Sequence, residues 1–109
     1  MSANTFQANL RALYPDQAES WLTALPVFLK SIETKLAIQI GAPFSNLTYH
    51  YVAPAISATG EALVFKCSIP SKDMHTEIAA LEHYNGEGCV KLIASDADAG
   101  WLLIEACQP

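Results

Sequence analysis

Two residues of opposite charge, Lys66 and Glu77, stand where the surrounding sequence predicts apolar surfaces. Lys66 lies within ALVFKCSI, residues 62–69, where β-branched and aromatic residues favour a strand. Glu77 lies in the next segment, which has the spacing of an amphipathic helix. Burying either charge alone is costly, whereas a lysine held by a carboxylate can bind an anion. The chemistry to consider is therefore recognition of a negatively charged group by a positioned lysine.

The periodicity of the two segments predicts that these charges meet. Alternation along the strand places Val64 and Lys66 on one face, opposite the face of Phe65. In the helix, Glu77 falls at the margin of an apolar stripe, so its carboxylate is expected to point toward the sheet. The stripe consists of Met74, Ile78 and Leu81. A simpler interpretation also fits this pattern, in which the lysine is a solvated edge residue and the glutamate a boundary residue that reaches water.

The composition is that of a single small domain. The chain has 109 residues, of which 51% are hydrophobic and 16% charged, enough for one ordinary core. A net charge of -5 with scattered lysines argues against a partner that is a nucleic acid or an anionic membrane. The sequence shows neither a signal-peptide pattern nor the roughly 20 apolar residues that cross a bilayer. We therefore expect a soluble, cytoplasmic protein.

The cysteines and histidines do not form a metal-binding pattern. The three cysteines are Cys67, Cys89 and Cys107. They lack C-x-x-C spacing, so reduced thiols without a disulfide are expected. His75 and His83 would lie on one helix but point in different directions, and His50 lies on a predicted strand. All three histidines are predicted to be surface or boundary residues.

The remaining patterns predict an α+β fold with a helical segment over residues 1–35 and a sheet with one helix over residues 36–109. Pro26 interrupts the helical pattern, so residues 15–36 form one helix or two. Ser71 is a candidate N-cap for the later helix. The predicted strands are residues 36–45, 46–57, 62–69, 89–95 and 100–106. These elements predict a five-stranded antiparallel sheet with one flanking helix after the third strand.

Five pieces of the chain, taken together, resemble the N-terminal part of a known kinase family. The pieces are the YVAPA strand, the lysine strand followed by proline, the helix HTEIAAL, the turn G-x-G-x-V-K-L and the segment LLIE. In combination they are similar to the aminoglycoside/hydroxyurea antibiotic resistance kinase family, which includes streptomycin phosphotransferases. The resemblance runs from about Trp21 to the last residue. It implies the small lobe of a protein-kinase-like fold.

The resemblance implies a role for each matching residue in binding ATP. Lys66 matches the lysine that binds the nucleotide phosphates, and Glu77 matches its helical partner. Val52 and Val64 match apolar positions beside adenine. At the hinge, the Glu105 carbonyl and the Cys107 amide match the groups that contact the adenine edge.

The loop of residues 41–46, which contains Ser45 and Asn46, matches the nucleotide loop between the first two strands. It has one glycine and a proline instead of the G-x-G-x-x-G pattern of protein kinases. An ordinary hairpin turn fits this segment equally well. The resemblance therefore predicts less backbone contact with phosphate here than in a protein kinase.

The family transfers the γ-phosphate of ATP to an alcohol group, and its catalytic aspartate and magnesium ligands belong to a large lobe. We therefore expect a nucleotide-binding lobe that is inactive alone, with Mg²⁺ bound only together with the large lobe. Two alternatives stay open. In the first alternative, the chain is a standalone non-catalytic domain that binds a nucleotide or a protein. In the second, it is a generic α+β domain in which the ion pair is structural. We also expect a homodimer formed through the exposed cleft surface.

Overall fold

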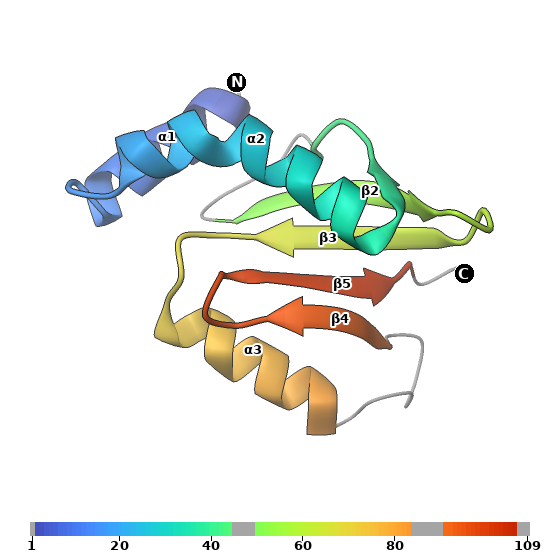
Figure 1. Cartoon of the computed structure of the whole chain (residues 1–109). Coiled ribbons are helices and arrows are strands. Elements are labelled where there is room, and N and C mark those ends of the chain that lie inside the picture. The colour runs from blue at the N-terminus through green and yellow to red at the C-terminus, as the bar shows by residue number, and fades with distance from the viewer. Residues whose placement is uncertain (1, 45–49, 84–90, 107–109) are drawn as a thin grey trace.

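The computed structural model describes residues 2–44, 50–83 and 91–106, which form helices and strands in the predicted order. The helices are α1 (Ser2–Leu13), α2 (Ala18–Leu36) and α3 (Lys72–His83). The strands are β1 (Ile38–Ile40), β2 (Tyr51–Ser57), β3 (Ala62–Cys67), β4 (Leu92–Asp96) and β5 (Trp101–Glu105). Neighbouring strands are antiparallel and lie in the order β1-β2-β3-β5-β4, and Figure 1 labels the last four of them. The fold is α+β, as predicted, and is compatible with a kinase-like small lobe.

The sheet order makes β3 the central strand. β2 pairs with one side of β3 and β5 pairs with the other. The chain leaves β3 through α3, continues into the edge strand β4, and returns through β5 between them. Lys66 therefore has paired backbone on both sides, opposite Val52 of β2 and Leu102 of β5.

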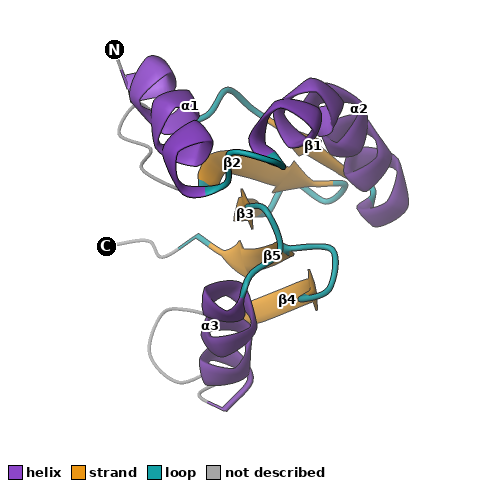
Figure 2. Ribbon diagram, turned by 90° about the vertical axis from the view of Figure 1, so that its left-hand side faces the viewer, coloured by secondary structure: helices purple, strands orange, loops and turns teal. Residues whose placement is uncertain are grey.

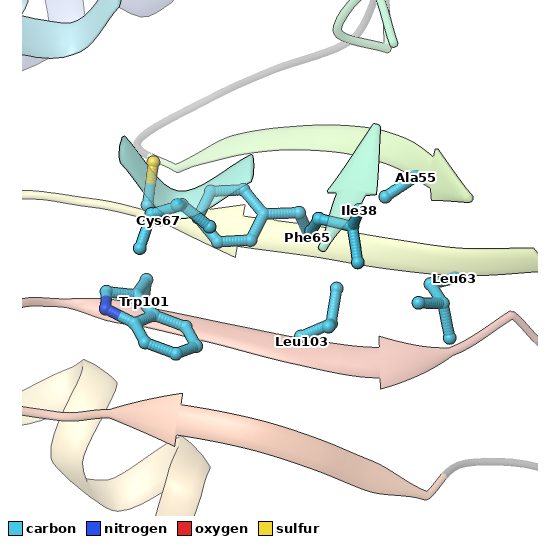
Figure 3. Packing of buried hydrophobic residues seen from close by; sticks show 8 residues of the cluster. Ile38, Ala55, Leu63, Phe65, Cys67, Trp101 and Leu103 are labelled. Carbon is cyan, nitrogen blue, oxygen red and sulfur yellow. The ribbon is translucent and has the colours of Figure 1, made fainter. Parts of the chain in front are cut away.

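One face of the sheet packs against α2. Phe65 and Trp101 lie with their ring centroids 6.1 Å apart, and Phe28 of α2 lies against Phe65 at 6.4 Å. Figure 3 shows the buried side chains that gather on this face. They are Ile38, Ala55, Leu63, Phe65, Cys67, Trp101 and Leu103. The alternation predicted for residues 62–67 is confirmed, because Leu63, Phe65 and Cys67 are all buried on this side.

Helix α2 is one continuous helix, although Pro26 lies inside it. Proline removes one helical hydrogen bond, and the packing of the residues on both sides of it outweighs that loss. Ala37 ends the helix in a left-handed conformation with φ 55°, and its amide donates to the Glu33 carbonyl. This turn sends the chain directly into β1.

Helix α1 covers the end of the sheet where β3 ends and β2 begins. Its buried residues Phe6 and Leu10 are four apart and so share one helical face. They pack against Ala18 of α2 and against Ile69, which follows β3. Helix α1 thus closes the core at this end of the sheet.

Helix α3 lies on the opposite face of the sheet from α2 (Figure 2). Met74 and Ile78 are buried against Leu102 of β5, and the predicted apolar stripe is thus the packing face. The predicted N-cap is confirmed, since the Met74 amide donates to Ser71 Oγ at 3.4 Å.

In the part of the chain that the structure describes, none of the helices has the length and apolar character required for a membrane span. Cys67 is a free, buried thiol, as predicted, and burial raises its pKa. Cys89 and Cys107 lie outside the described residues.

Candidate functional site

The site is built around an ion pair between the central strand and α3. Lys66 Nζ lies 2.7 Å from Glu77 Oε2, a short charge-assisted hydrogen bond. The predicted contact between these two side chains is therefore confirmed. Lys66 faces α3 because its neighbours Phe65 and Cys67 face α2. Glu77 faces Lys66 because it is one helical turn from the buried residue Met74, on the side of α3 that packs on the sheet.

The pair is neither fully buried nor fully solvated. The Lys66 side chain is 23% exposed and the Glu77 side chain 35% exposed. Part of the Lys66 side chain is thus open to solvent, while the bond to Glu77 limits the positions that the flexible lysine chain adopts. The alternative in which Lys66 is a solvated edge residue is wrong, because β3 is paired on both sides.

The two valines lie beside Lys66 on the sheet. Val52 is directly opposite Lys66, and Val64 is opposite both Pro54 and Ile104. Opposite residues of an antiparallel sheet share a face, so both valines are on the same face as Lys66. Both are half-buried, and Val52 also packs against the cluster of Ile69.

At the predicted hinge, the described backbone groups are tied to neighbouring strands. Glu105 ends β5, and its amide donates to the Lys91 carbonyl at 3.0 Å. The next amide, of Ala106, donates to the Ala62 carbonyl at 3.1 Å. These bonds fix the direction in which the chain leaves the sheet. Cys107 lies outside the described residues.

The predicted nucleotide loop is described as far as Phe44, and its members Ser45 and Asn46 lie outside the described residues. The Gly41 amide donates to the Pro54 carbonyl at 2.8 Å, and the Phe44 amide donates to the Val52 carbonyl at 2.9 Å. The first part of the loop thus continues along β2 beyond the end of β1. It therefore lies beside β2, the strand in which Val52 is opposite Lys66.

Comparison with known proteins supplies a second, independent observation. The chain is 21% identical over 98 residues to streptomycin 6-kinase of Streptomyces glaucescens, which covers 90% of this chain and 32% of that protein. It is 26% identical over 85 residues to hydroxyurea phosphotransferase of Kitasatospora aureofaciens, covering 78% of this chain and 25% of that protein. The chain is similar to antibiotic kinases.

The chain spans about a third of the length of the first relative and a quarter of the second. No family model and no solved structure matches it. The similarity to antibiotic kinases is therefore weak and partial, and it agrees with the resemblance found in the residues.

Glu33 was not singled out by the sequence, although it contacts the last residue of β1, just before the loop. Its Oε2 accepts a hydrogen bond from the Ile40 amide at 2.8 Å, and Lys30 Nζ lies 3.9 Å from its Oε1. Glu33 also lines a cavity of about 230 Å³ between α2 and the end of β1. Lys66 and Glu77 do not line this cavity. The cation that lines this cavity is Lys30, the partner of Glu33, so the cavity is separate from the ion pair of Lys66 and Glu77.

His50 is a second residue whose position the sequence did not reveal. It is half-buried, and it lies close enough to Lys66, Glu77 and Asp73 for all three charges to act on it. Burial, and after it Lys66, lowers the pKa of His50, while the two carboxylates act in the opposite direction. A strand histidine between tyrosines carries no signal for such a contact, because its charged neighbours come from β3 and α3.

Proposed function

We propose that this chain is the nucleotide-binding small lobe of a phosphotransferase related to the antibiotic kinases. In this proposal Lys66 binds the phosphates of ATP and Glu77 holds the lysine in position. The observation that carries the proposal is the 2.7 Å ion pair between the central strand and α3. The names of both similar proteins, a kinase and a phosphotransferase, are consistent with it.

The residues around the pair suit the two chemically different parts of ATP. The polyphosphate is an anion, and the partly exposed ammonium of Lys66 offers it a charge-assisted hydrogen bond. Adenine has flat aromatic faces that pack on apolar side chains, and Val52 and Val64 provide apolar surface on the same face of the sheet. The end of β5 at Glu105 then provides backbone for the adenine edge.

The complete reaction in this proposal is transfer of the ATP γ-phosphate to an alcohol group. Magnesium, when bound, neutralises charge on the phosphates, and a carboxylate accepts the proton of the acceptor hydroxyl. We assign both functions to a second lobe. Lys66 and its neighbours position the nucleotide, which alone removes only part of the barrier.

Thermal unfolding of the 109-residue chain with ATP, in the presence and absence of Mg²⁺, tests the proposal. A ligand at a hundredfold its dissociation constant stabilises a protein by about 2.7 kcal/mol, which raises the melting temperature of a domain of this size by about 10 °C. We expect this shift in the wild type and in the control Lys91→Met, which removes an exposed lysine elsewhere. We expect Lys66→Met to abolish it. An equal response of all three proteins, or none in the wild type, contradicts the proposal.

A specific observation also favours a second function, binding of another protein chain. Ile56 of β2 is 52% exposed, and its neighbour Pro54 is exposed on the same face of the sheet. These residues lie on the face of Lys66, where β2 extends beyond the residues that pack under α3. If ATP does not shift the thermal unfolding of the chain, but the chain binds a protein partner through this surface, the second function is supported.

A further inference from the structure

His50 lies at the phosphate-binding end of the proposed site. It immediately precedes β2, where Tyr51 pairs with Cys67 and Val52 pairs with Lys66. Alternation along the strand places His50 on the face of Val52 and Lys66. Helix α3 follows the end of β3 (Figure 1), and Asp73 in its first turn is one of the charges that act on His50.

The charged groups that act on His50 come from two elements. The charge of Lys66 acts on it from β3, and the charges of Glu77 and Asp73 act on it from α3. Burial is the largest influence and lowers the pKa of His50 below its ordinary value, with Lys66 acting in the same direction. The imidazole is therefore neutral near pH 7. It forms no hydrogen bond or ion pair with any residue that the structure describes.

We propose that His50 is a second phosphate-binding group, which takes up a proton as the phosphates of a nucleotide bind beside Lys66. This inference rests on the proposed function. One lysine and two carboxylates act on His50, so phosphates would add further negative charge to surroundings that are not positive overall. A protonated imidazole compensates this charge and donates a hydrogen bond to a phosphate oxygen.

The direction of the pH dependence follows from the charges. A bound phosphate favours the charged form of a neighbouring imidazole, so the pKa of His50 rises in the complex. By linkage, the complex binds more protons than the free chain, and nucleotide affinity increases as the pH falls. The increase ends at a pH below the lowered pKa of the free chain, where His50 is protonated before the ligand binds.

Isothermal titration calorimetry of the full 109-residue chain with ATP, in EDTA, tests the inference at about pH 8 and about pH 6. The wild type and H50Q are compared, because the titration of ATP itself is common to both. We expect the affinity ratio of wild type to H50Q to rise by about threefold to tenfold at the lower pH. Buffers with different ionisation enthalpies should report proton uptake by the wild type that H50Q lacks.

Two controls separate phosphate binding from other roles. His75 faces Asp98, with Nε2 3.6 Å from Oδ1, so H75Q should behave as the wild type. Adenosine has no phosphates, and its binding should not change in H50Q. A loss that is equal for ATP and adenosine indicates a packing role and overturns the inference.

The outcomes also separate this inference from the proposed function. ATP binding that requires Lys66 but has the same pH dependence in wild type and H50Q overturns the role of His50 alone. A wild-type chain that does not bind ATP at either pH overturns both.

Discussion

Lys66 and Glu77 carry opposite charges in a half-buried position between a strand and a helix, and their mutual contact is measurable without any ligand. Removal of either charge leaves the other without its partner at 2.7 Å. Because both side chains remain partly exposed, water compensates some of the loss. We predict that K66M and E77Q each reduce the free energy of unfolding, with a coupling energy of about 1 kcal/mol in the double-mutant cycle. Urea unfolding of the wild type, K66M, E77Q and the double variant measures this coupling energy. Additive effects of the two substitutions would show that the contact contributes nothing to stability.

The ion pair could be predicted from the sequence, whereas the positions of Glu33 and His50 could not. Period-two and helical spacing place Lys66 and Glu77 on facing surfaces, and burial of charge requires them to meet. Glu33 instead contacts the backbone of Ile40, and every residue type offers the same backbone amide, so the sequence carries no signal for this contact. The surroundings of His50 come from β3 and α3 together, so they depend on the complete fold.

At the scale of elements, the order of helices and strands was predictable because each has a clear hydrophobic period. The ends of the elements were less predictable. The strand expected over residues 62–69 ends at Cys67, and the chain then continues as the connection to α3. The sequence does not show whether Pro26 lies inside one helix or separates two helices. The structure has one helix, and residues on both sides of Pro26 pack against the core. Such outcomes depend on tertiary contacts, which local patterns do not contain.

The turn between β4 and β5 depends on Gly100, which joins that hairpin to the connection between β3 and α3. Gly100 has φ 84°, and an added Cβ would lie 2.4 Å from the Ser68 carbonyl oxygen. Gly60 has a similar φ of 89°, but a Cβ added there would have no atom beyond its chain neighbours within 4 Å. We predict that G60A costs about 1 kcal/mol from backbone strain alone. G100A should cost at least about 2 kcal/mol more, because the steric overlap is added.

Thermal or urea unfolding of the two glycine variants measures this difference. The comparison isolates the steric contribution, since the positive φ is common to both positions. Equal destabilisation by G60A and G100A would show that the contact with Ser68 relaxes easily. In that case the turn does not constrain the position of α3 relative to β3.

At the scale of the whole molecule, the two faces of the sheet are covered to different extents. Helix α2 packs over the face of Phe65 and Trp101, whereas α3 packs mainly against β4 and β5 on the other face (Figure 2). The second face therefore presents Pro54 and Ile56 of β2 to solvent next to the Lys66 site. Neighbouring exposed apolar side chains of this kind offer a surface on which another chain can pack.

We predict that the 109-residue chain self-associates through this β2 surface at high protein concentration. Ile56→Glu places a charge in the contact and should yield a monomer by light scattering coupled to size-exclusion chromatography. Val27→Glu is the matched control, because Val27 is 75% exposed on α2 and lies outside this surface. A nucleotide bound beside Lys66 would occupy the neighbouring part of the same face, so ATP should shift the wild type toward the monomer. A wild type that is monomeric at every concentration, or equal effects of the two variants, would remove the β2 surface as the site of association.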